Sequence, residues 1–157
     1  MRFVITAALT FLLDALVKFL SRGLAGSAIT IPGLLELRLT RNTGMALGLL
    51  RDGGTVLLLL PLAVIAAGAF LLRRYHSTGY VKIATGLIAG GFLGNFIERL
   101  VKGYVVDMIY FPFMPWFVCN IADVAICAGV AMLVVSILFR PGDWREKHAT
   151  DEPSGPV

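Results

Sequence analysis

The sequence is poor in charged residues. Only 15% of its 157 residues are Asp, Glu, Lys or Arg, whereas 57% are hydrophobic. A soluble domain typically carries about 25% charged residues, so this composition excludes one and indicates an integral membrane protein. The net charge of +4 does not indicate nucleic-acid binding, because the basic residues are scattered near the ends of apolar segments and form no cluster.

Cysteine and histidine are also scarce, with two residues of each. Cys119 and Cys127 lie eight residues apart in one apolar segment, about 12 Å along a helix, which is too far for a disulfide. We expect both to be small core residues. His76 and His148 lie in a polar connection and near the C-terminus. We therefore expect no metal site, no cofactor and no Ser/His pair.

Long apolar runs are what the sequence does contain. Four of them have roughly the 20 residues that cross a bilayer core. They cover residues 3–21, 55–72, 81–100 and 118–139. We expect an all-α membrane protein, a four-transmembrane-helix bundle with a small extracytoplasmic β-sheet element, as one domain over residues 1–140. Residues 141–157 are polar and contain proline, which predicts a disordered cytoplasmic tail.

The basic residues predict the orientation of these spans. Arg73, Arg74 and Lys82 crowd the short connection after the second span, and Arg140 follows the fourth. The positive-inside rule places these segments, and with an even number of spans both termini, on the cytoplasmic side. The segments after the first and third spans then lie outside. In the first of them, "LELRLT" (35–40) alternates apolar and polar residues as a half-buried strand does, and "RNTGMALG" favours a tight turn.

Two of the spans carry polar residues on one face. Asp14 and Lys18 are four residues apart in the first run, which also looks like a secretory signal peptide; charges inside the run favour a retained helix. In the third span a line of small residues predicts close helix packing. It consists of Gly86, Gly90 and Gly94. Asn95 and Arg99 share the neighbouring line.

Two aspartates flank the aromatic stretch before the fourth span. Asp107 precedes it, and Asp123 lies inside the apolar run, three residues after Asn120 on the same helical face. The connection between the third and fourth spans is short, so the carboxylates can meet at the outer interface. Two poorly solvated carboxylates share a proton, which is the arrangement that an aspartic protease uses to activate water.

Other interpretations of these residues stay open. Either aspartate can cap a helix or pair with Lys18 or Arg99. Asp14, Lys18 and Asp123 can also form the relay of a small proton-coupled carrier. A structural membrane subunit would use the glycine line as its partner interface.

Five motifs in order carry a family resemblance: "LDALVK", "RNTGMA", "GGFLGNFIER", "YVVDMI" and "CNIADVAI". Together they resemble lipoprotein signal peptidase, the bacterial signal peptidase II family. The resemblance implies a monomeric aspartyl endopeptidase of the bacterial cytoplasmic (inner) membrane, without cofactor, surrounded by membrane lipid and active near the outer, periplasmic face. It implies cleavage of diacylglyceryl-modified prolipoproteins just before the lipidated cysteine.

The resemblance also implies roles for individual residues. Asp107 and Asp123 match the catalytic pair, and Asn120 matches the residue beside the second aspartate. Asn42 and Gly44 match an Asn-x-Gly element expected to line the site.

Four further residues match the helical motifs of the family. Asn95 and Arg99 match groups that hold substrate backbone or the catalytic pair, and Asp14 and Lys18 match a supporting ion pair.

The sequence departs from the family pattern at two positions. Glu98 stands where Asp is more usual, and Cys119 stands where Phe is common. Neither removes a proposed catalytic group, so both bear on packing and substrate fit. A presenilin-like protease is disfavoured because the sequence contains no GxGD.

Overall fold

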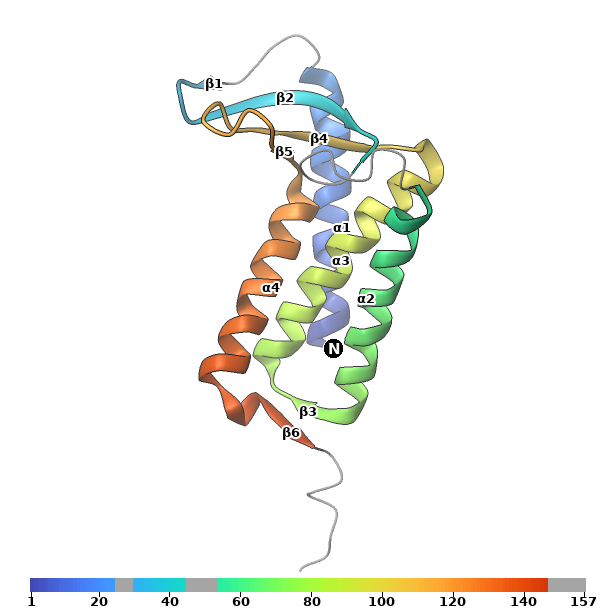
Figure 1. The fold of residues 1–157 in the computed structure, drawn as a ribbon, viewed down its shortest axis with the longest axis vertical. Coiled ribbons are helices and arrows are strands. Elements are labelled where there is room, and N and C mark those ends of the chain that lie inside the picture. The colour runs from blue at the N-terminus through green and yellow to red at the C-terminus, as the bar shows by residue number, and fades with distance from the viewer. Residues whose placement is uncertain (25–29, 45–53, 147–157) are drawn as a thin grey trace, which may run out of the picture.

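Four long helices lie side by side, and a small sheet crosses one end of them (Figure 1). The computed structural model describes residues 1–24, 30–44 and 54–146. The helices are α1 (Arg2–Ser21), α2 (Gly54–Arg74), α3 (Gly79–Lys102) and α4 (Ile121–Phe139). The sheet consists of β1 (Thr30–Ile31), β2 (Leu35–Asn42), β4 (Val105–Tyr110) and β5 (Val118–Cys119), in the order β1-β2-β4-β5. At the other end β3 (Tyr75–Ser77) pairs with β6 (Trp144–Glu146), next to the 3-10 helix η3 (Pro141–Asp143); a second 3-10 helix, η1 (Arg22–Leu24), follows α1.

Within the described residues, α1, α3 and α4 are long and apolar enough to cross a membrane. Helix α2 occupies the expected second span, and the count of four crossings stays a prediction. The expected start of the fourth span at residue 118 is wrong by three residues. Val118 and Cys119 instead pair with β4 as strand β5, and the helix begins at Ile121.

Helix α1 buries its polar face and exposes its apolar one. Its buried residues are Thr10, Asp14, Lys18 and Ser21. Its exposed face includes Leu9, Leu12, Leu13 and Leu16. A bilayer solvates such leucines, whereas ionisable residues in a membrane face the interior of the bundle. The pattern is the reverse of a soluble helix and fits a retained membrane span.

Helix α3 is the centre of the bundle because its glycines admit close neighbours. A Cβ on Gly86 would lie 2.8 Å from the Phe3 carbonyl oxygen, and one on Gly94 would lie 2.7 Å from Asp14 Oδ2. The glycine line therefore packs against α1, which confirms the predicted close approach. Gly91, the residue after Gly90, faces α4: a Cβ there would lie 2.6 Å from the Ala122 carbonyl oxygen.

The sheet brings the outer connections together over the ends of the helices. Strand β2 confirms the strand predicted from "LELRLT", and it pairs antiparallel with β4 so that Thr40 lies opposite Asp107. Strand β5 pairs with β4 and leads directly into α4. Asp107 and the first turn of α4 therefore lie at the same end of the molecule. The part of "RNTGMALG" after Gly44 lies outside the described residues.

The expectation of a disordered tail from residue 141 is wrong for residues 141–146. They form η3 and β6 because a buried carboxylate holds them against the helices. Asp143 accepts hydrogen bonds from Thr78 Oγ1 (2.7 Å), Ser136 Oγ (2.7 Å) and Arg140 Nε (2.8 Å). The Trp144 indole N–H donates to Ser136 Oγ at 3.1 Å. Residues 147–157 lie outside the described residues.

Gly90→Ala should destabilise the protein. The added Cβ would lie 2.8 Å from Thr10 Cβ and would also meet the Ala7 carbonyl oxygen, so α1 and α3 must separate. Overpacking of this kind costs about 1–3 kcal/mol, against a gain of about 1 kcal/mol from helix propensity. We expect a lower Tm in detergent than for Gly68→Ala, whose Cβ meets nothing within 4 Å. Equal or higher Tm for Gly90→Ala would contradict this packing.

Candidate active site

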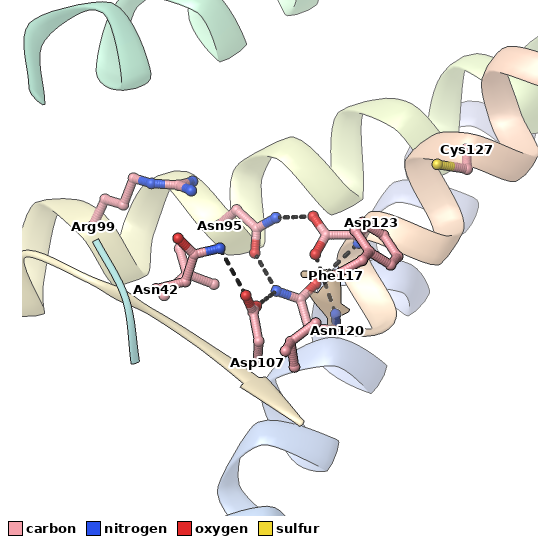
Figure 2. A pocket seen from close by; sticks show the side chains of 10 residues that line it. Asn42, Asn95, Arg99, Asp107, Phe117, Asn120, Asp123 and Cys127 are labelled. Atoms are coloured by element: carbon pink, nitrogen blue, oxygen red, sulfur yellow. Dashed lines mark hydrogen bonds between the residues drawn. The ribbon is translucent and has the colours of Figure 1, made fainter. Parts of the chain in front are cut away.

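A cavity of about 160 Å³ lies where β4 meets α3 and α4. Six of the nine predicted site residues line it and gather around one hydrogen-bonded network (Figure 2). These six are Asn42, Asn95, Arg99, Asp107, Asn120 and Asp123. Three predicted residues, Gly44, Asp14 and Lys18, act on the network from outside the cavity wall.

Asp107 is held by two asparagine amides. Its side chain projects from β4 and is 1% exposed. Asn42 Nδ2 donates to Asp107 Oδ2 at 2.8 Å, and Asn120 Nδ2 donates to Oδ1 at 2.6 Å. Both carboxylate oxygens thus accept from neutral donors, and the side chain has one orientation.

Burial raises the pKa of Asp107 to about 6, against the lowering effect of the Asn42 hydrogen bond. The negative charge of Asp123 raises it further. A carboxyl that titrates near neutral pH can both accept and return a proton during a reaction.

Asp123 is fixed by the N-terminus of α4. Asn120 is the N-cap residue: its Oδ1 accepts from the Asp123 N–H at 2.9 Å, and its own N–H donates to Asp123 Oδ2 at 3.1 Å. This reciprocal pair is a capping box, in which Asn replaces the more usual Ser or Thr. Asn120 was expected inside the helix, and the N-x-x-D spacing is the sequence signal for a cap. Asn120 therefore contacts both aspartates.

Asn95 of α3 connects Asp123 to a buried lysine. Asn95 Nδ2 donates to Asp123 Oδ1 at 2.9 Å, and Asn95 Oδ1 accepts from Lys18 Nζ at 2.9 Å. An ammonium group can only donate. Lys18 therefore determines which end of the Asn95 amide faces Asp123. The same oxygen accepts from Asn120 Nδ2 at 3.1 Å, which fixes the amide further.

Asp14 and Lys18 form the expected ion pair, with Lys18 Nζ 2.7 Å from Asp14 Oδ2. The other oxygen of Asp14 accepts from the backbone N–H of Ala122 at 2.9 Å, in the first turn of α4. The pair thus links α1 to the helix that carries Asp123.

Glu98 has a role that the sequence analysis missed. Its Oε2 lies 3.2 Å from Lys18 Nζ and accepts from the backbone N–H of Val106 at 3.0 Å, and its Oε1 pairs with Lys102. Val106 immediately precedes Asp107 in β4, so Glu98 anchors that strand to α3. The Glu98/Lys102 i,i+4 spacing was visible in the sequence, but the long-range contact to Val106 was not.

Arg99 holds the Asn-x-Gly element against the cavity. Its Nη2 donates to the Gly44 carbonyl oxygen at 3.1 Å, and the Gly44 N–H donates to Asn42 Oδ1 at 2.9 Å. Over the part of the chain that is described, Arg99 Nε is the one buried side-chain nitrogen or oxygen without a hydrogen-bond partner. A buried donor left without a partner costs about 1–3 kcal/mol.

The cysteines differ from each other. Cys119 is buried, as expected, and burial raises the pKa of its thiol to about 12, so it is not a nucleophile at neutral pH. The expectation of a core position is wrong for Cys127, which is exposed and lines the cavity. It lies one helical turn after Asp123 and shares its face. Among the described residues no group of three His, Cys, Asp or Glu side chains could hold a metal ion.

Lys18→Met should destabilise the protein by about 3–5 kcal/mol, because it leaves the buried Asp14 carboxylate without its cation. We expect a large fall in Tm in detergent. Lys102→Met is the matched control, since its side chain is partly exposed and its loss should cost about 1 kcal/mol or less. If the Tm of Lys18→Met were no lower than that of Lys102→Met, the buried ion pair would not stabilise the fold as proposed.

The chain is similar to known proteins over most of its length. Residues 6–139 match the family described as Signal peptidase (SPase) II. A lipoprotein signal peptidase of Halothermothrix orenii is 34% identical over 94% of this chain and 98% of its own length. A lipoprotein signal peptidase of Streptococcus pyogenes serotype M2 is 33% identical over 92% of this chain and 94% of its own length.

Two solved structures of bacterial membrane enzymes share the fold. One superposes with a TM-score of 0.75 over 99% of this chain and 93% of its own, and the other with 0.73 over 87% and 92%, each at 24% identity. At this identity the likeness is one of fold. The family match covers most of the chain and includes every residue of the cavity, so the chain belongs to the signal peptidase II family.

Proposed function

We propose that this chain is an aspartic endopeptidase that removes the signal peptide from diacylglyceryl-modified prolipoproteins, with Asp107 and Asp123 as its catalytic pair. The observation that carries the proposal is the presence of both carboxylates in one cavity, joined by the shared contacts of Asn120. Family membership implies a protease, and the relatives' name supplies the substrate class. Cleavage just before the lipidated cysteine follows the family resemblance.

The reaction needs one proton on the pair. The ionised carboxyl accepts a proton from a water molecule, whose oxygen attacks the scissile carbonyl carbon, while the protonated carboxyl donates to the carbonyl oxygen. The tetrahedral intermediate then loses the amine, which leaves with a proton from the pair. The raised pKa of Asp107, about 6, supports such exchange near neutral pH. No covalent intermediate is required.

The substrate backbone binds beside the pair. Arg99 supplies a guanidinium group to the cavity wall, and Phe117 and Val118 supply an apolar surface. Near the sheet, Phe113 and Trp116 are 57% and 64% exposed, as expected of aromatic residues at a membrane interface. A lipid-anchored substrate thus enters from the bilayer, with the cavity at the periplasmic face, both termini in the cytoplasm, and one chain sufficient for activity.

A proton-coupled carrier is the second candidate. It would use Asp14, Lys18 and Asp123 as a relay, yet Asp14 and Lys18 hold each other at 2.7 Å and both bind structural groups. Among the described residues, the next buried ionisable side chain toward the other end is Asp143, beyond the end of α4. A proton relay across the bundle would need buried ionisable groups in the stretch between, so the described residues favour a peptidase over a carrier.

Asp107→Asn and Asp123→Asn should each reduce cleavage by about 100-fold or more, because each removes one member of the proton-transfer pair. The assay is the gel shift of a diacylglyceryl-modified prolipoprotein incubated with purified protein, beside its unlipidated counterpart. We expect product from the lipidated form only.

The matched control is Asp143→Asn, a buried carboxylate at the opposite end of the bundle, which should retain cleavage. Near-wild-type cleavage by either active-site variant would refute the catalytic pair. Wild-type protein that is folded but yields no product would instead require proton-flux measurements in liposomes.

A further inference from the structure

A second cavity, of about 180 Å³, lies toward the end of the bundle that carries β3 and β6, away from Asp107 and Asp123 (Figure 1 shows this end at the bottom). All four helices and β6 contribute to its wall. The lining residues include Phe3 of α1, Ile65 and Gly68 of α2, Ile88 of α3, Leu133 of α4 and Trp144.

The wall of this cavity offers hydrocarbon and no free polar group. Its polar side chains are Thr85 and Trp144. The Thr85 hydroxyl donates to the Val81 carbonyl oxygen at 2.8 Å, and the Trp144 indole donates to Ser136 Oγ at 3.1 Å. An apolar cavity of comparable size stays dry and takes up a small hydrocarbon. In a bilayer the available hydrocarbon is an acyl chain.

Three of the helices that line this cavity carry a basic residue near a lining residue. Arg73 lies four residues after Ala69 and Lys82 lies three before Thr85, so each shares a helical face with a lining residue. Arg2 precedes the lining residue Phe3 and packs against Gly79, three residues before Lys82 in α3.

All three basic side chains are exposed. Arg73 is about 6 Å beyond Ala69 along the helix axis, toward the end of the bundle. The distance suits a lipid whose chain enters the cavity while its phosphate stays at the membrane surface.

Among the described side chains of this end, the acidic one, Asp143, does not neutralise the basic rim. Asp143 is 3% exposed, and its carboxylate is already bound by Thr78, Ser136 and Arg140. Arg140 itself lies over the Tyr80 ring, 4.4 Å from its centroid. Arg74, which is also exposed, lies over the Tyr75 ring, 5.9 Å from its centroid. Arg2, Arg73 and Lys82 are the exposed cations aligned with the cavity wall.

We propose that this cavity and its basic rim form a binding site for an anionic phospholipid of the surrounding leaflet. One acyl chain lies in the cavity against Trp144, and Arg2, Arg73 and Lys82 bind the phosphate. Charge complementarity favours an anionic headgroup over a zwitterionic one, and each basic residue contributes roughly fivefold to this preference. The site is separate from the peptidase cavity and does not depend on its chemistry.

Trp144 gives a direct readout of occupancy. A Trp116→Phe background leaves Trp144 as the only indole of the chain. This protein is reconstituted into phosphatidylcholine vesicles that contain increasing fractions of acyl-brominated phosphatidylglycerol or acyl-brominated phosphatidylcholine with identical chains. Bromine quenches an indole on contact. We expect half-maximal quenching at a lower fraction of the anionic lipid, by roughly fivefold for each basic residue that binds the phosphate. Arg73→Gln combined with Lys82→Gln should remove most of this difference.

Gly68→Leu tests the cavity itself. A Cβ at Gly68 meets nothing within 4 Å, and Leu is a strong helix former, so this variant should fold and fill the space. Quenching by both lipids should fall. Ala66→Leu, on an exposed position of α2 that does not line the cavity, is the matched control and should quench like the parent.

Two results would overturn the proposal. Equal quenching curves for the two brominated lipids would remove the anionic preference. Equal maximal quenching in Gly68→Leu and Ala66→Leu would show that no acyl chain occupies the cavity. Thermal unfolding of each variant confirms that the comparison is between folded proteins, and peptidase activity plays no part in the readout.

Discussion

The buried ammonium group of Lys18 is the interaction on which the rest of the structure depends. Lys18 Nζ contacts Asp14 at 2.7 Å, Asn95 at 2.9 Å and Glu98 at 3.2 Å. A charge in a low-dielectric interior is tolerated only with well-placed partners, so these contacts fix the position of α1 against α3. Each of these three partners in turn fixes the position of another element. Asp14 binds the first turn of α4, Glu98 binds β4, and Asn95 binds Asp123.

Among the described residues, amide groups and no cation hydrogen-bond the two aspartates. Asn42 and Asn120 donate to Asp107, and Asn95 donates to Asp123. A direct lysine or arginine contact would stabilise the ionised form strongly and would oppose a shared proton. Here the Asn95 amide stands between Lys18 and Asp123. The network thus orients both carboxylates firmly and still allows Asp107 a pKa of about 6.

Much of this could be predicted from the sequence because a bilayer simplifies the problem. Apolar runs of the right length located the helices, and two-residue alternation located β2. The pairing of Asp14 with Lys18 and the approach of α1 to the α3 glycines followed from helical periodicity. The meeting of Asp107 and Asp123 followed from the short connection between two spans.

The parts that could not be predicted depend on long-range register. Whether Cys127 faced the core or the cavity depended on the rotation of α4, which Asn120 and Asp14 set from outside the helix. The contact of Glu98 with Val106 depended on how β4 crosses the end of α3. Residues 141–146 looked like a tail because the partners of Asp143 include Thr78, more than sixty residues away.

The proposed reaction requires Asp107 and Asp123 to act as one electrostatic pair. Infrared titration of the protonated-carboxyl band, assigned to Asp107 by its loss in Asp107→Asn, measures this directly. In the wild type the band should disappear as pH rises through about 6. In Asp123→Asn the midpoint should move to lower pH, because the negative charge that helps to raise the pKa of Asp107 is gone. An unchanged midpoint in Asp123→Asn would show that the two carboxyls titrate independently and would contradict the catalytic pair.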